Sequence, residues 1–246
     1  MSPAPVALIT GGARGLGRSL VSTFSSAGYR VATCGRHEPE EPIEADFLVC
    51  DVRDPDQVAA MVAEVHERMG RIDVLVNNAG GTPYASTDEM SPRLFERVIA
   101  LNLVAPFYVA QVVNRVMQAQ DEGGVIVNIG SVAALRPSPN SVPYAAAKNG
   151  LTGLTRGLAI EWAPKVRVVQ VTPGLLRTEL VAETYGPNVA AVEATIPAGR
   201  FAEASEIAGA CLTLCGPGMA YMTGSELVID GGGEIPSWLL AMGGGA

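Results

Sequence analysis

Short apolar runs alternate along this chain with longer segments in which apolar residues recur every three or four positions. The apolar runs lie at residues 6–10, 30–34, 47–50, 74–77, 124–129, 166–171 and 226–229. Such runs are typical of strands that are buried on both faces, as in a parallel sheet covered by helices. The periodic segments predict helices at residues 16–27, 58–69, 94–118, 144–162 and 204–215. This alternation predicts a doubly wound α/β domain.

Prolines modify the pattern at two places. The connection between the second and third predicted strands is short and contains Pro39 and Pro42. A parallel crossover needs roughly a dozen residues including its helix, so we predict a loop in place of a helix here. In the long helix at residues 94–118, Pro106 predicts a kink or a local adjustment of the backbone.

A glycine-rich segment follows the first strand and opens the first helix. Residues 10–17 read Thr-Gly-Gly-Ala-Arg-Gly-Leu-Gly. Gly11, Gly15 and Gly17 allow a tight turn, a close approach to a pyrophosphate, and contact between helix and strand. The helix that begins near Leu16 offers free N–H groups to an anion. The segment therefore predicts a site for the phosphates of a dinucleotide.

The end of the second strand indicates which dinucleotide binds. Folds that use NAD place an acidic residue there to bind the ribose hydroxyls, whereas this chain has Gly35 followed by Arg36. A second arginine, Arg14, lies within the glycine-rich turn. Two guanidinium groups beside the ribose suit a 2′-phosphate, so we expect NADP(H) to be favoured over NAD(H). Two solvated surface arginines are the alternative interpretation.

Three polar residues near the fifth strand suit hydride chemistry. Tyr144 and Lys148 are four positions apart, so they share one face of a helix. A phenol can protonate the alkoxide that hydride delivery creates, and an adjacent ammonium group lowers the pKa of that phenol. Ser131, just past the fifth strand, can hold the carbonyl oxygen as its charge grows. Because ligands bind at the carboxyl ends of parallel strands, we expect these residues to form one site.

The sequence resembles the short-chain dehydrogenase/reductase family over essentially its whole length. It is similar to the branch with a Tyr-x-x-x-Lys motif, which includes NADP(H)-dependent ketoreductases and 3-oxoacyl reductases. Besides the residues just named, the matching segments are Asp51-Val52, Asn77-Asn78-Ala79-Gly80, Asn102, Pro173-Gly174 with Leu176 and Thr178, residues 196–201 and residues 230–232. The resemblance implies a single-domain Rossmann fold over residues 1–246, with a seven-stranded parallel sheet in the order 3-2-1-4-5-6-7 and helices on both faces.

The resemblance also implies a role for each site residue. Tyr144 donates the proton in reduction, while Lys148 holds the nicotinamide ribose and lowers the pKa of Tyr144. Ser131 orients the carbonyl group, and Asn102 anchors a water relay to Lys148. With the two arginines included, the expected cofactor contacts are Gly11, Arg14, Gly15, Leu16, Gly17, Arg36, Asp51, Val52, Asn78, Ala79, Gly80, Tyr144, Lys148, Pro173, Gly174, Leu176 and Thr178. A homotetramer or homodimer is implied, built by pairing the helices that carry Asn102 and Tyr144.

The charge and composition of the chain narrow its possible partners. It has 25 acidic and 17 basic residues and a net charge of −8, which argues against nucleic-acid binding. We find no apolar stretch long enough to predict a membrane span. The cysteines Cys34, Cys50, Cys211 and Cys215 show no metal-binding spacing and are expected to be buried as small apolar side chains. We therefore expect no metal and a reduced, cytoplasmic protein.

Three segments are expected to wall the substrate pocket, namely residues 81–92, 132–143 and 175–200, the last of which is a predicted helical lid. Arg136 is predicted to be a solvated loop residue, with contact to an anionic substrate as the alternative. The acidic chain would steer an acidic acyl carrier protein poorly, so we favour a free or coenzyme A-linked small ketone. The apolar tail at residues 235–246 is expected to pack on a neighbouring subunit or on its own domain.

Other functions stay open on the sequence alone. They are a 3-oxoacyl-acyl-carrier-protein reductase, an NAD-dependent alcohol or hydroxysteroid dehydrogenase, and a nonenzymatic NADP(H)-binding regulator. The intact set of Asn102, Ser131, Tyr144 and Lys148 argues against the regulator, because a protein that only binds has no need of Tyr144.

Overall fold

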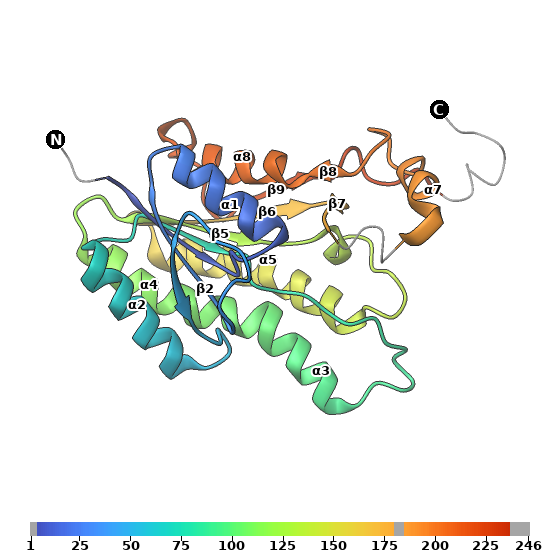
Figure 1. The fold of residues 1–246 in the computed structure, drawn as a ribbon, viewed down its shortest axis with the longest axis horizontal. Coiled ribbons are helices and arrows are strands. Elements are labelled where there is room, and N and C mark those ends of the chain that lie inside the picture. Colours follow the sequence, from blue (N-terminus) through green and yellow to red (C-terminus); the bar gives the residue numbers. More distant parts are fainter. Residues whose placement is uncertain (1–3, 180–184, 237–246) are drawn as a thin grey trace.

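The computed structural model describes residues 4–179 and 185–236. Seven parallel strands form its main sheet in the order β3-β2-β1-β4-β5-β6-β9 (Figure 1). They are β1 (Val6–Thr10), β2 (Arg30–Gly35), β3 (Asp46–Val49), β4 (Val74–Asn77), β5 (Gly124–Ile129), β6 (Val166–Pro173) and β9 (Glu226–Ile229). The predicted strand order is confirmed, with β9 as the seventh strand of the sheet.

Helices cover both faces of this sheet (Figure 1). On one face lie α1 (Gly15–Ser26) and α8 (Ala204–Cys215), which pack against each other. On the other face lie α2 (Pro55–Met69), α4 (Ala105–Ala119) and α5 (Val142–Trp162). Each layer encloses an aliphatic core, and successive strand residues such as Leu8 and Ile9 point into opposite layers. The doubly wound architecture is therefore confirmed.

The connection from β2 to β3 contains no helix, as the prolines predict. The guanidinium group of Arg18 on α1 holds this loop: it donates to the carbonyl oxygen of Pro42 at 3.0 Å and pairs with Glu41 at 3.1 Å. The edge strand β3 stays partly uncovered, and Val49 is 59% exposed. The carboxyl end of β2, where Arg36 lies, is thus covered by a loop alone.

The helix predicted at residues 94–118 is one helical run whose type changes in the middle. α3 (Pro92–Ile99) leads into a π-helical turn, η1 (Ala100–Val104), and then into α4. The change lies just before Pro106, where the sequence predicts an adjustment. Turns of this type occur frequently at functional sites, and this one carries Asn102.

The same run corrects one expectation from the sequence. Among the described residues, Pro92–Ala119 is the one helix long and apolar enough to cross a membrane. Its α4 part packs against α2 and the sheet, however, and Val109, Val113 and Met117 are buried in the core. Helices that are apolar on most sides are common in the core of a layered domain. The run Pro92–Ala119 is such a core helix.

The structure adds short elements that the hydrophobic pattern did not indicate. A small second sheet pairs β7 (Leu176–Arg177) with β8 (Ala202–Glu203), and the predicted lid contains η3 (Gly186–Asn188) and α7 (Val189–Glu193). Two further 3-10 turns are η2 (Val132–Ala134) and η4 (Pro217–Met219). Lid residues 180–184 and the tail from residue 237 lie outside the described residues, so the packing of the tail stays a prediction.

Two glycines with contrasting surroundings test the packing of α1. A Cβ atom on Gly17 would lie 2.0 Å from the carbonyl oxygen of Gly11, so Gly17→Ala forces the turn apart. We expect a loss of about 1–3 kcal/mol in the free energy of unfolding, measured by urea denaturation. Gly153→Ala on α5 meets no atom within 4 Å and should instead stabilise by about 0.5–1 kcal/mol. Equal effects of the two variants would contradict this account.

Candidate active site

The glycine-rich turn and the loop after β4 are locked together at the carboxyl ends of β1 and β4. The hydroxyl of Thr10 accepts the backbone N–H groups of Asn78 and Ala79, each at 3.0 Å. The side-chain amide of Asn78 donates to the carbonyl oxygens of Thr10 at 2.9 Å and of Gly11 at 3.2 Å. The structure therefore brings together residues that the sequence assigns to the cofactor from two separate motifs.

The turn has the shape that a dinucleotide requires. Its backbone is packed as closely as glycine permits, because a Cβ atom on Gly17 would collide with Gly11. The first turn of α1 has no side-chain cap among the described residues, which leaves its N–H groups for an anion. Atoms of Glu179 and Thr178 lie 3.8 Å and 4.0 Å from a Cβ atom built on Gly15. The backbone N–H groups at this turn suit the phosphates of a dinucleotide.

The expected adenosine side lies at the carboxyl ends of β2 and β3. Asp51 forms an ion pair with Arg53, and the shortest nitrogen–oxygen distance is 2.5 Å. The hydrogen bonds from Arg53, and more weakly the charge of Arg36, hold the pKa of Asp51 below its usual value. Arg14 and Arg36 are both exposed, and Val52 is buried beside the pair. Arg36 therefore lies on the same side of the sheet as Asp51, at the carboxyl end of the neighbouring strand.

Ser131, Tyr144 and Lys148 meet at the carboxyl end of β5. Tyr144 lies in the first turn of α5, and Nζ of Lys148 is 5.6 Å from the centroid of its ring. Lys148 is 4% exposed and donates to the carbonyl oxygen of Ile129 at 2.7 Å. The hydroxyl of Ser131 caps the turn η2. The sequence-predicted catalytic side chains thus occupy one site.

Burial acts in opposite directions on the two ionisable groups of this site. It raises the pKa of Tyr144, while a hydrogen bond with Ser131 lowers that pKa by less. It lowers the pKa of Lys148 to about 8. The lowering of the Tyr144 pKa by Lys148, which the family resemblance implies, stays a prediction. Tyr84, which sequence reasoning did not single out, adds a small further rise.

Asn102 is fully buried, and its side chain holds the loop after β4. Its Oδ1 accepts the N–H group of Gly81 at 3.0 Å, and its Nδ2 donates to the carbonyl oxygens of Gly81 at 2.8 Å and of Val98 at 2.9 Å. A Cβ atom on Gly80 would lie 2.8 Å from Oδ1 of Asn102 and 3.5 Å from Nζ of Lys148. Asn102 thus positions the loop beside Lys148, and the water relay stays a prediction.

Arg136 is an exposed loop residue, as the sequence suggests, but it is also engaged by two carboxylates. Its guanidinium group pairs with Asp230 at 2.7 Å and also with Glu234. Arg136 and Asp230 are 94 positions apart, so no local sequence signal could reveal the contact. The segment after β9 therefore lies against the loop after β5.

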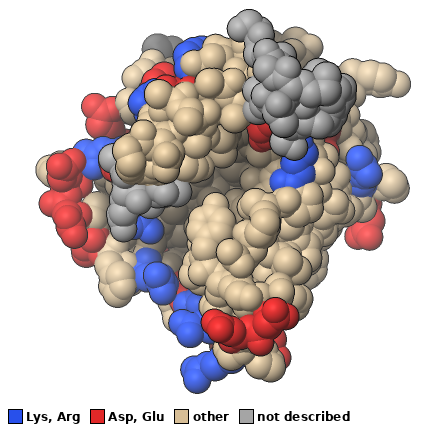
Figure 2. All heavy atoms as spheres, turned by 90° about the vertical axis from the view of Figure 1, so that its right-hand side faces the viewer, with Lys and Arg blue, Asp and Glu red and all other residues tan. Residues whose placement is uncertain are grey.

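The loops that were expected to wall a pocket project from one end of the molecule. Figure 2 shows this end, where the surface is hollowed at its centre between walls that are mostly uncharged. Lys, Arg, Asp and Glu lie mainly around the rim (Figure 2). Two of the expected walls touch, because the N–H group of Ala85 donates to the carbonyl oxygen of Asn140 at 3.0 Å.

Comparison with known proteins assigns the family. A family model described as enoyl-(acyl carrier protein) reductase matches residues 11–234. The chain is 37% identical to the D-threitol dehydrogenase of Mycolicibacterium smegmatis over 242 residues, which cover 94% of this chain and 93% of that protein. The chain belongs to the short-chain dehydrogenase/reductase family. It is an oxidoreductase that acts on alcohol or carbonyl groups, with a fold that binds NAD or NADP.

Solved structures of short-chain dehydrogenases/reductases share the whole fold. The ligand-free aldohexose dehydrogenase of Thermoplasma acidophilum superposes with a TM-score of 0.88 at 30% identity, over 94% of both chains. A variant of the actinorhodin polyketide ketoreductase with NADPH has a TM-score of 0.86 at 34% identity, over 93% of this chain and 97% of that one. The likeness covers both the cofactor half and the catalytic half of the sheet.

The buried charge of Lys148 leads to a prediction about stability. Its pKa is about 8 in the folded protein against an ordinary 10.5, so the unfolded chain binds more protons between these values. Stability should therefore rise with pH in this window. Lys148→Met removes the buried charge, and at pH 7 we expect it to raise the free energy of unfolding by about 1–3 kcal/mol. The gain should shrink towards pH 10.

Lys165 provides a matched control for this variant. It is the other lysine of the chain and also donates to a backbone carbonyl oxygen, that of Gln118 at 2.6 Å, but it is partly exposed. Lys165→Met should leave the free energy of unfolding nearly unchanged at every pH. Urea denaturation at pH 7 and pH 10 separates the two, and a destabilised Lys148→Met protein at pH 7 would refute the prediction.

Proposed function

We propose that this enzyme uses NADP(H) to reduce the ketone group of a small free or coenzyme A-linked substrate to a secondary alcohol. The observation that carries the proposal is the meeting of Ser131, Tyr144 and Lys148 at the carboxyl end of β5. The same residues would support oxidation of the alcohol in the reverse direction.

Tyr144, Ser131 and Lys148 each have a separate role in the proposed reduction. A bound nicotinamide supplies hydride chemistry. Tyr144, whose pKa is raised by burial, stays protonated at neutral pH and donates its proton to the oxygen of the substrate. Ser131 donates a hydrogen bond to the same oxygen and orients it. Lys148 is cationic below about pH 8 and stabilises the phenolate that remains on Tyr144.

Two exposed arginines support the preference for NADP(H). Arg36 follows directly after β2, where NAD-binding folds carry an acidic residue, and Arg14 begins the first turn of α1. Asp51 is the nearby carboxylate, and its charge is balanced by Arg53. Arg36 therefore keeps its own charge for a 2′-phosphate.

The net charge of −8 supports a free substrate over one carried by an acidic protein. The curated relative named above is a dehydrogenase of D-threitol and one structural neighbour is a dehydrogenase of aldohexoses, which are both free small molecules. A 3-oxoacyl-acyl-carrier-protein reductase is the second candidate, since another neighbour is a polyketide ketoreductase. A carrier thioester that is a much better substrate than the free or coenzyme A form would favour this second candidate.

We also propose a cytoplasmic homotetramer or homodimer in which α4 and α5 pair across a subunit interface. Ile160 on α5 is 82% exposed, and a partner subunit on this face would bury it. Analytical ultracentrifugation distinguishes these assemblies from a monomer.

Tyr144→Phe tests the chemistry. Removal of the proton donor should lower kcat/KM with NADPH and a panel of ketones by roughly 10²–10⁴-fold. The dissociation constant for NADPH, measured by fluorescence titration, should stay close to that of the parent enzyme. Tyr29→Phe, at the amino end of β2, is the matched control and should retain full activity. Undiminished turnover in Tyr144→Phe, or no turnover by the parent enzyme across the panel, would contradict the proposed function.

Arg36→Asp tests the cofactor preference. The new carboxylate repels a 2′-phosphate and can accept hydrogen bonds from ribose hydroxyls, so the ratio of kcat/KM for NADPH to that for NADH should fall by roughly 10–100-fold. Arg93→Asp on α3 makes the same change in net charge at another exposed site and should leave the ratio unchanged. A parent enzyme that prefers NADH would refute the preference directly.

A further inference from the structure

The segment after β9 is built to lie in close contact with two other loops. We name residues 230–236 the strap. Gly231, Gly232 and Gly233 have φ angles of 68°, 98° and 86°, a run of left-handed conformations that only glycine adopts easily. The three glycines have no side chains, so the backbone of the strap can pass close to the neighbouring segments at these positions.

Both sides of the glycine run are in tight contact. A Cβ atom on Gly231 would lie 2.9 Å from Cγ2 of Ile196, and one on Gly232 would lie 3.0 Å from Cβ of Pro197. A Cβ atom on Gly233 would lie 3.3 Å from Nη1 of Arg136. The strap is thus packed between the end of the lid and the loop that follows β5.

On the catalytic side, Arg136 is the anchor. Asp230 and Glu234 both pair with its guanidinium group, one from each end of the glycine run. The N–H group of Arg136 donates to the carbonyl oxygen of Val132 at 2.8 Å, in the same short turn that Ser131 caps. A displacement of Arg136 is therefore transmitted to Ser131 through one turn of backbone.

On the lid side, the strap is held by backbone hydrogen bonds. The N–H group of Ile235 donates to the carbonyl oxygen of Thr195 at 2.8 Å, and the N–H group of Ala198 donates to that of Gly231 at 2.9 Å. Residues 195–198, which we name the lid base, follow α7 and precede β8. The strap therefore links the lid base to the loop of Ser131.

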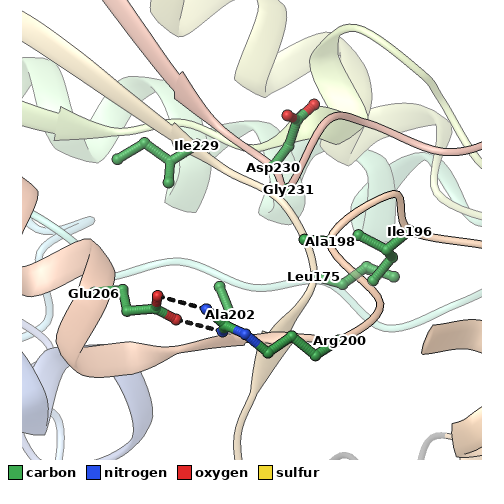
Figure 3. A pocket seen from close by; sticks show the side chains of 9 residues that line it. All are labelled: Leu175, Ile196, Ala198, Arg200, Ala202, Glu206, Ile229, Asp230 and Gly231. Carbon is green, nitrogen blue, oxygen red and sulfur yellow. Dashed lines mark hydrogen bonds and ion pairs between the residues drawn. The ribbon is translucent and has the colours of Figure 1, made fainter.

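A cavity also borders the lid base. It has a volume of about 120 Å³ and is lined by Leu175, Ile196, Ala198, Ala202 and Ile229, with the Arg200–Glu206 ion pair at one wall (Figure 3). The carboxylate of Asp230 points away from that ion pair (Figure 3). Ile196 of the lid base is buried beside Phe201, so this packing and the hydrogen bonds of the strap hold the lid base together.

We propose that Arg136 is a positioning residue whose grip on the strap sets the place of the Ser131 loop and of the lid base together. The inference rests on the proposed function, since it concerns how two segments beside the substrate site of that reaction are held in place. Arg136 does not bind an anionic group of the substrate in this proposal, because two carboxylates of the protein already pair with its guanidinium group. The side chains of these ion pairs are partly exposed, so the pairs add little to the free energy of unfolding. We expect their loss to change the positions of the loops more than the stability of the fold.

The test compares Arg136→Ala, Arg136→Lys and Glu234→Gln with Glu122→Gln. Glu122 is a matched control, because it also shares an arginine, Arg71, with a second carboxylate, Asp73, but lies outside the substrate site. Arg136→Ala should raise KM for an uncharged ketone about tenfold, with a smaller change in kcat and an unchanged dissociation constant for NADPH. Arg136→Lys should recover part of the loss, and Glu234→Gln should show a smaller rise in KM. Glu122→Gln should match the parent enzyme.

Hydrogen exchange gives a second measurement that needs no activity. In Arg136→Ala, the backbone amides of residues 132–136 and 195–198 should exchange faster together, while those of α2 stay unchanged. Exchange and KM equal to those of the parent enzyme would overturn the proposal, as would a loss confined to anionic ketones. If the parent enzyme reduces no ketone, the proposed function fails. The exchange rates then still test whether Arg136 holds the strap in place. If Arg136→Ala does not fold, Glu234→Gln decides by the same two measurements.

Discussion

The parallel pairing of β1 with β4 is the constraint on which the rest of this structure depends. From β1 the chain runs outward through β2 to β3, then crosses back to β4 and runs outward to β9. Where the direction reverses, the segments that follow β1 and β4 diverge to opposite faces and open a crevice. The hydroxyl of Thr10 closes the floor of this crevice by accepting two N–H groups from the loop after β4. The cofactor turn and the loop after β4 therefore share one base.

Burial of Tyr144 and Lys148 suits the proposed chemistry but lowers the stability of the fold. The same exclusion of water that keeps Tyr144 protonated makes the charge of Lys148 costly. Lys148 donates to a single backbone carbonyl among the described residues, so the protein compensates this charge only in part. The two aliphatic cores on either side of the sheet stabilise the fold independently of this site. The fold therefore stays stable despite the cost of the buried charge.

The charges around the site are largely engaged with one another. Asp51 pairs with Arg53, Arg136 pairs with Asp230 and Glu234, and Arg177 at the lid pairs with Glu193. These pairs leave the hollow with mostly uncharged walls and join segments far apart in the chain. The ion pairs thus also connect the loops around the site.

Local signals in the sequence determined the strands, the missing helix after β2 and the convergence of Ser131, Tyr144 and Lys148. Each depends on a repeat, a turn or a motif within a few residues. The order of the strands came from the family resemblance, which the motifs carry, and the structure has that order. Only the tertiary structure decided the net pKa of Tyr144, the partners of Arg136, the role of the apolar run Pro92–Ala119 and the two-residue strands β7 and β8. Burial, long-range ion pairs and packing arise between residues far apart in the chain, and no short window of sequence records them.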